Sequence, residues 1–319
     1  MSSRRESGTS HHDHNYQYKI DESTRLGSGK YARVFKGKHV KTGNVVAIKR
    51  FFPITFDKVV FDREREINEL LLYHPNIIMY LYSYWDPGTG HPCYVFELAE
   101  GGSVRTYLLT HEHYSEDDAM EIIKGTLTGL EYLHYKGIIH RDIKPANILL
   151  KRKSSRHHDT FKWDAALADF GIASELGSGE TVEFLYAGTP KYFPPEAIVT
   201  GQVGKGGDLW ATGIMMHIIF TGYVPWSQTK DEIAMMDEIK QMEFDFRKPQ
   251  YRHISPNALH LMSNLLPKVE VRPSAHSALD QQVYQWYLTA SKEKILNNRE
   301  FCKWHTPDKT IKKKKNEGG

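Results

Sequence analysis

Cysteine is scarce in this sequence, since only Cys93 and Cys302 occur among 319 residues. Two thiols are too few for the disulfide framework that stabilises small secreted domains, so we expect a reducing compartment. No apolar run is long enough to cross a bilayer, and the first residues lack the apolar stretch of a secretory signal. We therefore expect a cytoplasmic protein, with the nucleus as an alternative, and no membrane partner.

The sequence also lacks a large excess of charge of either sign. It has 42 Lys and Arg against 39 Asp and Glu, a formal net charge of +3. Such a mixed surface gives no reason to expect nucleic acid as the main partner. Hydrophobic residues make up 40% of the chain, which is enough to bury a substantial core in one large two-lobed domain or in two smaller domains.

Both ends of the sequence lack apolar periodicity. Residues 1–17 are polar and include His11, His12 and His14, for which the sequence offers no second cluster of metal ligands, so we expect a disordered tail. Residues 291–319 are predicted to be a basic tail. We interpret the run Lys312–Lys315 as solvated, with a nuclear-entry signal as the alternative. A calmodulin-type target over Lys292–Lys315 is a further alternative, but Pro307 would interrupt such a helix, so we expect an unstructured tail.

Between these tails the hydrophobic pattern changes near residue 98. Residues 18–97 show β-branched, alternating segments with glycine-rich turns and one amphipathic helix over 57–72. Residues 98–290 show helical spacing instead, interrupted by a basic, aperiodic stretch at 151–160 that we interpret as an inserted loop. We therefore predict an α+β fold with a small antiparallel-sheet lobe and a larger, mainly helical lobe. The strands are expected from Tyr18 onward and over 33–40, 44–50, 78–84 and 93–98, and the later helices over 117–135, 204–222, 231–241, 256–266 and 280–294.

A glycine-rich segment, Leu26-Gly27-Ser28-Gly29, ends the first predicted strand. Glycines at such a turn let backbone N–H groups approach phosphate oxygens without obstruction by a Cβ atom. Val34 follows in the next strand, and fifteen residues later Val46-Ala47-Ile48-Lys49 places an ammonium where it can hold phosphates.

The helix over 57–72 offers three carboxylates as partners for Lys49. We predict Glu66, because Leu70 lies one turn further on and is expected to face the core. Glu64 and Glu69 are the alternatives.

The segment His140-Arg141-Asp142-Ile143-Lys144-Pro145-Ala146-Asn147 carries the strongest chemical signal. An alcohol that acts as a nucleophile needs a carboxylate to orient it and to accept its proton, and Asp142 supplies that group. Asn147 and Asp169, the latter in Asp169-Phe170-Gly171, supply the neutral and charged oxygens that Mg²⁺ prefers.

These segments together resemble the eukaryotic protein kinase family, over about residues 18–286. The resemblance implies a bilobal fold, ATP and Mg²⁺ as cofactors, and transfer of the γ-phosphate to hydroxyl groups of protein substrates. It implies Asp142, Lys144 and Lys49 as catalytic residues, and Asn147 and Asp169 as metal ligands. It places ATP against Leu26, Gly27, Ser28, Gly29, Val34, Ala47, Lys49, Glu66, Phe96, Glu97, Ala99 and Leu149, with Phe96 as the gatekeeper and backbone groups of Glu97 and Ala99 reading the adenine.

Lys144 and the later Gly188-Thr189-Pro190 resemble the serine/threonine kinases, in which the lysine steadies the γ-phosphate. Other segments are similar to both the calcium/calmodulin-dependent and the sterile-twenty groups, and the choice between them stays open. By resemblance, Glu196 pairs with Arg272, and Asp208 accepts hydrogen bonds from the backbone of the catalytic loop.

Arg141 precedes the base, and by resemblance such kinases are activated by phosphorylation of a loop, here at Thr181 first and at Ser178 or Ser174 second, by an upstream kinase. Ala146 stands where many arginine-directed kinases have glutamate, which argues against strong selection for basic substrates. Two alternative functions are a pseudokinase or scaffold of the same fold, and a small-molecule kinase. The oligomeric state cannot be read from the sequence.

Overall fold

The computed structural model describes residues 17–110, 115–152, 163–227, 231–267 and 269–280. The chain divides into two compact units. The first consists of Met1–Leu70 and Met79–Leu98, and the second of Leu71–Ile78 and Ala99–Gly319.

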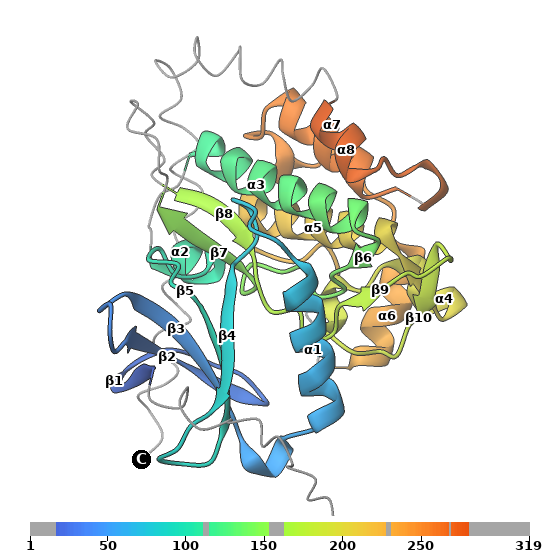
Figure 1. Cartoon of the computed structure of the whole chain (residues 1–319). Helices are drawn as coiled ribbons and strands as arrows, with labels where there is room; N and C mark the ends of the chain where they lie inside the picture. Colours follow the sequence, from blue (N-terminus) through green and yellow to red (C-terminus); the bar gives the residue numbers. More distant parts are fainter. Residues whose placement is uncertain (1–16, 111–114, 153–162, 228–230, 268, 281–319) are drawn as a thin grey trace, which may run out of the picture. The chain divides into compact units, whose positions relative to one another are not determined.

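The first unit is built on a five-stranded sheet with the strand order β1-β2-β3-β5-β4 (Figure 1). Every neighbouring pair is antiparallel, as the predicted short, alternating segments require. The strands are β1 (Tyr18–Ser28), β2 (Ala32–His39), β3 (Val45–Phe51), β4 (Tyr80–Trp85) and β5 (Pro92–Glu97).

The two faces of this sheet have different cores, because successive side chains along a strand point to opposite sides. On one face, helix α1 (Lys58–Leu70) contributes Phe61, whose ring stacks on Tyr94 with 4.4 Å between ring centroids, beside Phe51. On the other face, residues such as Ile48 and Val95 are fully buried beneath the β1 residue Tyr18 and its neighbours. The sheet is therefore buried on both sides, in part by its own edge strand.

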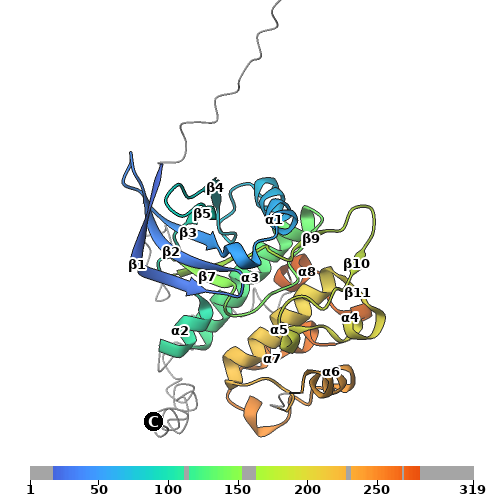
Figure 2. The same ribbon diagram turned by 90° about the horizontal axis from the view of Figure 1, so that it is seen from below.

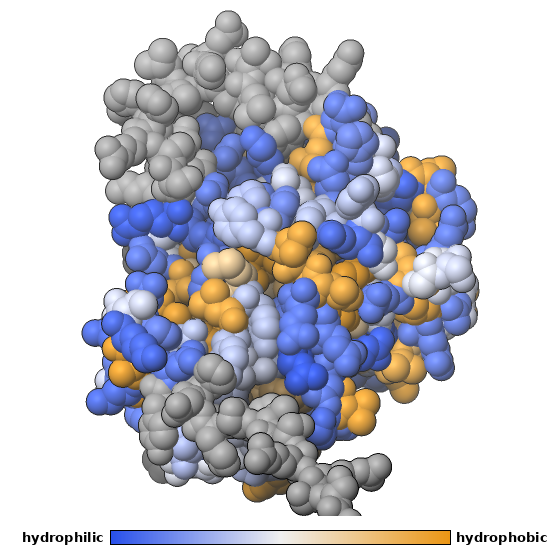
Figure 3. Space-filling view, in the orientation of Figure 1, coloured by the Kyte–Doolittle hydropathy of each residue, from blue (hydrophilic) through white to orange (hydrophobic). Residues whose placement is uncertain are grey.

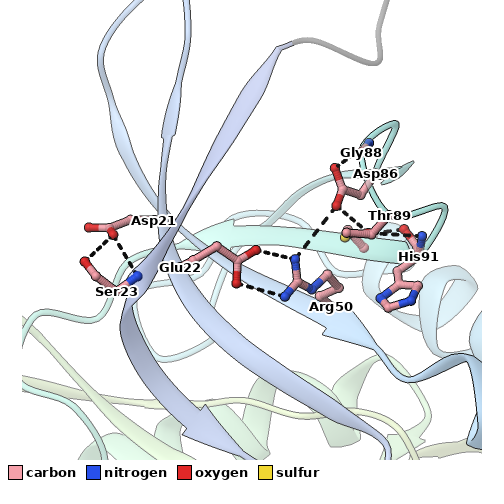
Figure 4. A network of polar contacts seen from close by, with 9 residues as sticks. Asp21, Glu22, Ser23, Arg50, Asp86, Gly88, Thr89 and His91 are labelled. Carbon is pink, nitrogen blue, oxygen red and sulfur yellow. Dashed lines mark hydrogen bonds and ion pairs between the residues drawn. The ribbon is translucent and has the colours of Figure 1, made fainter.

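A polar network ties the edge strand β1 to the centre of the sheet (Figure 4). Arg50 on β3 donates hydrogen bonds to both carboxylate oxygens of Glu22 on β1, at 2.5 and 3.0 Å. Its guanidinium also lies 3.8 Å from Asp86 in the β4–β5 turn and 4.7 Å from the centroid of the Phe35 ring. One arginine thus anchors the strand that ends in the glycine-rich segment.

The second unit is mainly helical, with three two-stranded sheets (Figures 1 and 2). Helix α3 packs against α5 and α8, and α5 is buried over most of its length. The helices are α2 (Val104–Thr110), α3 (Glu116–Tyr135), α4 (Pro195–Thr200), α5 (Lys205–Thr221), α6 (Glu232–Gln241), α7 (Pro256–Leu265) and α8 (Ala275–Asp280). The strand pairs are β6 (Ile138–Ile139) with β9 (Ser174–Glu175), β7 (Ile148–Arg152) with β8 (Trp163–Leu167), and β10 (Thr181–Glu183) with β11 (Gln202–Gly204).

Local chemistry sets the ends of the long helices. Ser115 caps α3 by accepting a hydrogen bond from the N–H of Asp118, whose side chain bonds back to the Ser115 N–H, so the helix starts at Glu116. Gly222, with φ of 84°, ends α5 in the left-handed conformation that glycine adopts without strain.

The predicted α+β class is confirmed, and the long helices of the second unit, α3, α5, α6 and α7, begin and end within one residue of their predicted bounds. The segment Leu71–Ile78, which the sequence placed in the first lobe, belongs to the second unit. The reason is its hydrogen bonds: the N–H of Leu72 donates to the Tyr132 hydroxyl and the N–H of Ile78 to the Leu167 carbonyl, both at 2.9 Å.

The inserted loop predicted over 151–160 needs a similar correction at its start. Lys151 and Arg152 continue β7, where they pair with Asp164 and Trp163, and 153–160 lie outside the described residues. The helix predicted over 280–294 is also outside them except for Asp280, which ends α8. Both predicted tails lie there too, apart from Gln17.

Exposed hydrophobic side chains are present on a largely hydrophilic surface, as the face drawn in Figure 3 shows. On α1 they include Val59, Val60 and Leu70. Within the part of the chain that the structure describes, no helix combines the length and apolar character needed to span a bilayer.

Candidate active site

Lys49 on β3 forms an ion pair with Glu64 on α1, with 2.6 Å between Nζ and Oε1. The predicted partner Glu66 is wrong. Glu64 lies three residues after Phe61 and three before Ile67, and all three are buried on one side of the helix. Glu66 is exposed, as is Leu70, the residue that argued for it. At about 100° per residue, Glu66 lies on a different side of the helix from Glu64.

The residues assigned to the nucleotide in the first unit share one face of the sheet. Gly27 lies opposite Val34, and Val34 lies opposite Lys49. Ala47, two residues before Lys49, lies opposite the half-buried Phe96. Because directly opposed residues in an antiparallel pair point to the same side, these five side chains or Cα positions line a single surface.

The backbone of the glycine-rich turn is accessible to a ligand. The N–H of Gly29 donates to the carbonyl of Ala32 at 2.9 Å, which closes the turn between β1 and β2. A Cβ atom at Gly27 would meet no atom of the described residues within 4 Å, and one at Gly29 would meet only the Ala32 carbonyl oxygen, at 3.9 Å. The neighbours Leu26 and Ser28 are exposed. Phosphate oxygens can therefore approach this backbone, as the sequence predicts.

Two of the backbone groups assigned to adenine already have partners. The N–H of Glu97 donates to the carbonyl of Met79 at 3.0 Å, and the carbonyl of Ala99 accepts from the N–H of Gly102 at 3.2 Å. That backbone groups of Glu97 and Ala99 contact adenine stays a prediction. In the second unit, Leu149 lies on β7 and forms an isolated bridge with Ser103, close in sequence to Ala99.

Asp142 is fixed by three donors within the second unit. The ammonium of Lys144 and the side-chain amide of Asn147 donate to Oδ2, at 2.6 and 2.9 Å. The hydroxyl of Thr189 donates to Oδ1 at 3.1 Å, and Lys144 also donates to Thr189 at 2.8 Å. The sequence used Thr189 only as a class marker, and its contact with Asp142 was missed because 47 residues separate them.

The buried side chain of Asp208 holds the backbone of the catalytic loop by hydrogen bonds. Asp208 accepts hydrogen bonds from the N–H groups of His140 and Arg141, at 2.9 and 2.8 Å, and from Nε2 of His134 at 2.9 Å. Burial by itself raises the pKa of Asp208, but the bonds from His134 and His140 outweigh it and leave the pKa below its ordinary value. Arg141 has a φ of 69°, an uncommon conformation for a residue with a side chain, which these bonds hold in place.

Asn147 and Asp169 fit a magnesium ion by their chemistry. The amide nitrogen of Asn147 donates to the carbonyl and the carboxylate of Asp142, both at 2.9 Å, so its orientation presents the amide oxygen as the ligand atom. The N–H of Ala168 donates to the Asn147 carbonyl at 2.9 Å, which places Asp169 beside Asn147. Asp169 is exposed, with φ of 66°.

The remaining magnesium ligands must come from elsewhere. Among the described residues there is no group of three or more His, Cys, Asp or Glu that could hold a metal. Mg²⁺ typically takes one or two protein oxygens and completes its shell with water and substrate phosphates, which suits this pair of residues.

Comparison with known proteins shows to which family this chain belongs. A family model described as the protein kinase domain matches residues 20–284, most of the chain. This chain belongs to the protein kinase family. The match confirms the family to which the sequence assigned it.

Two curated kinases illustrate the similarity. Calcium/calmodulin-dependent protein kinase type II subunit delta of Oryctolagus cuniculus is 33% identical over 254 residues, which cover 78% of this chain and 45% of that protein. A DNA damage response protein kinase of Saccharomyces cerevisiae is 33% identical over 257 residues, which cover 76% of this chain and 50% of that protein. The matched part of this kinase thus spans about half the length of these relatives.

Other residues of the kinase lie where the resemblance placed them. Arg272, whose side chain is fully buried, donates to the Glu196 carboxylate at 2.7 Å and stacks over Trp210. A buried arginine needs such a partner, because an uncompensated charge in the core is strongly destabilising.

The three candidate phosphorylation sites differ in exposure. Ser174 is buried and accepts a hydrogen bond from the Arg141 guanidinium at 2.8 Å. Ser178 and Thr181 are exposed, and Thr181 lies on β10 next to Glu183, whose carbonyl accepts from Arg141 at 3.4 Å. Exposure therefore favours Thr181 and Ser178 over Ser174 as sites that another enzyme can reach.

Proposed function

We propose that this kinase transfers the γ-phosphate of ATP to serine or threonine hydroxyls of protein substrates. The observation that carries the proposal is the fixed carboxylate of Asp142, held by Lys144, Thr189 and Asn147. A carboxylate held in one orientation can align a substrate hydroxyl and accept its proton.

The transfer is a balanced displacement at the γ-phosphorus. The substrate oxygen forms a bond to phosphorus, the bond to the bridging oxygen of ADP breaks, and the hydroxyl proton passes to Asp142. Lys144 offsets charge that develops on the transferred group, and Lys49, oriented by Glu64, holds the α- and β-phosphates. Asn147 and Asp169 would hold a magnesium ion, which would supply positive charge against the phosphates.

We also propose that phosphorylation of Thr181 regulates activity. Arg141 already reaches the segment around Thr181 through Ser174 and the carbonyl of Glu183. A phosphate nearby would give its guanidinium a stronger, charge-assisted partner and order the segment. Phosphopeptide mapping of active enzyme, combined with Thr181→Ala, tests this, and full activity of the variant would contradict it.

The function itself is tested with purified protein, labelled ATP and a generic protein substrate. Wild type should give phosphoserine or phosphothreonine in a magnesium-dependent reaction, and Asp142→Asn should give almost none. No incorporation above background by either protein would instead favour the pseudokinase or scaffold, and equal incorporation by both would contradict the role of Asp142. Phosphate found only on small metabolites would favour a small-molecule kinase.

A further inference from the structure

Two exposed basic residues of the second unit lack acidic partners within the part of the chain that the structure describes. Arg105 lies in the first turn of α2, and Lys191 lies in the 3₁₀ turn η2 (Pro190–Tyr192). Neither forms an ion pair with any carboxylate among the residues that the structure describes. Lys144, in contrast, is paired with Asp142 at 2.6 Å.

Backbone and side-chain contacts bring these residues to the catalytic loop. The N–H of Arg105 donates to the carbonyl of Pro145 at 2.8 Å, so α2 begins against the residue that follows Lys144. Lys191 comes two residues after Thr189, which contacts both Lys144 and Asp142. Arg105 and Lys191 therefore lie on two elements that both contact the catalytic loop.

The electrostatics show that the three cations influence one another. Partial burial, followed by repulsion from Arg105 and Lys144, lowers the pKa of Lys191. The Lys191 ammonium also lies 5.7 Å from the centroid of the Tyr192 ring. Lys144 has Asp142 as its counter-charge, whereas Arg105 and Lys191 form no ion pair among the described residues, and like charges in that state favour binding of an anion.

We propose that Arg105 and Lys191 form a binding site for an acidic side chain of the protein substrate, next to the serine or threonine that is phosphorylated. The proposal rests on the protein kinase activity proposed above and adds a substrate class to it. The anion is a carboxylate of Asp or Glu, or the phosphate of a residue modified earlier by another kinase. Both are recognised by the same charge-assisted hydrogen bonds from arginine and lysine.

Ala146 supports this assignment because it carries no negative charge. It lies in the catalytic loop between the Pro145 carbonyl that accepts from Arg105 and the Asn147 side chain that contacts Asp142. An acidic residue there would neutralise the two cations, and alanine leaves their charge available for a ligand.

The test measures peptide phosphorylation with one neutral serine peptide as the reference. Glu, phosphoserine, Arg or Ala is placed in turn at each of the five positions on either side of the serine. Wild type should show a kcat/KM about tenfold higher for Glu or phosphoserine than for Ala at one or more positions, mainly through a lower KM. Comparison of the Glu and phosphoserine series identifies which anion the site prefers.

Charge reversal assigns the preference to these residues. The double variant Arg105→Glu/Lys191→Glu should lose the acidic preference and favour Arg at the same positions. Lys136→Glu/Arg252→Glu is a matched control, because it makes the same change at the exposed residues that directly follow α3 and the 3₁₀ turn η3 (Pro249–Tyr251). Binding of fluorescent Glu and Ala peptides without ATP, followed by anisotropy, gives a readout that does not depend on turnover.

The possible failures are distinguishable. If wild type phosphorylates the neutral peptide but shows no preference for acidic ones, the anion site is wrong and the kinase function stands. A preference that survives in Arg105→Glu/Lys191→Glu, or disappears equally in the control, also overturns the site. If wild type phosphorylates no peptide, and the labelled acidic peptide binds no better than the neutral one, both proposals fail.

Discussion

Two lysine–carboxylate pairs, one in each unit, have the same separation of 2.6 Å but different surroundings. In the first unit, Lys49 on a strand meets Glu64 on a helix, and Glu64 is 2% exposed. In the second, Lys144 and Asp142 lie two residues apart in one loop, and both side chains are more exposed than Glu64. The buried carboxylate of the first pair positions its lysine, whereas the more accessible carboxylate of the second is the proposed reactive group. In the first pair the carboxylate thus serves the lysine, and in the second pair the lysine serves the carboxylate.

The two pairs should differ most in the kinetic effect of replacing their lysines. Lys144→Met removes the ammonium that contacts both Asp142 and Thr189, and we expect kcat to fall about 10²-fold or more at saturating ATP. Lys49→Met should instead raise the KM for ATP as well as lower kcat, because that lysine is assigned to the phosphates. Steady-state kinetics with varied ATP separates the two. An identical pattern for both variants would contradict the distinction.

A substitution at Gly188 tests how much space remains beside Asp142 of the second pair. Gly188 has φ of 113°, and a Cβ atom there would lie 3.5 Å from Oδ1 of Asp142 and 3.2 Å from Ile172. Because 3.2 Å is a tight approach and 3.5 Å an ordinary contact, Gly188→Ala should strain the backbone and crowd Ile172. The resulting shift of this segment, which contacts Asp142, should reduce kcat/KM about 10²-fold.

The control for this variant is Gly177→Ala. Gly177 also has positive φ, 59°, but its Cβ would meet no described atom within 4 Å. It carries the backbone cost without the contact with Asp142, so its loss of kcat/KM should be much smaller. Thermal melting shows whether each variant is folded. Equal losses of activity in the two folded variants would show that backbone strain alone is responsible.

The first pair is tested by a comparison of neighbours on α1. Glu64→Gln should raise the KM for ATP about tenfold, because it removes the charge that orients Lys49. Glu66→Gln, at an exposed position on the same helix, should leave the KM for ATP unchanged. ATP titrations of both proteins measure this. An effect of Glu66→Gln equal to that of Glu64→Gln would restore the partner that the sequence favoured.

The smallest expected effect concerns pH and the anchor of the catalytic loop. The pKa of Asp208 in the folded protein lies below its ordinary value of 3.8. Ionised Asp208 therefore contributes stability that is fully present above the pKa of the unfolded chain, and that is lost as pH falls through the folded value. We expect the difference in free energy of unfolding between wild type and Asp208→Asn to shrink below about pH 4. Urea unfolding at pH 7 and at pH 3.5 measures it, and a difference that grows on acidification would contradict this sign.

How much the sequence predicts differs between the two pairs. Asp142, Lys144 and Asn147 lie within one short segment, so their proximity follows from chain connectivity and the motif was sufficient. The partner of Lys49 depends on which side of α1 faces the sheet. There the exposed Leu70 misled the prediction, because apolar residues also occur on protein surfaces.

Other features needed the folded chain for the same reason. Thr189 reaches Asp142 across 47 residues, and Leu71–Ile78 joins the second unit through hydrogen bonds to Tyr132 and Leu167. Strands such as β6 and β9 have only two residues, too few to show any periodicity. The long helices were predictable because their apolar spacing extends over several turns.

The central assignment is that Asp142 accepts the proton of the substrate hydroxyl. The rate of a single turnover tests this role directly. Enzyme in excess over labelled ATP, mixed rapidly with a serine peptide, reports the phosphoryl-transfer step separately from product release. We predict that Asp142→Asn slows this step about 10³-fold while binding ATP as wild type does. A single-turnover rate for Asp142→Asn equal to that of wild type would contradict the assignment.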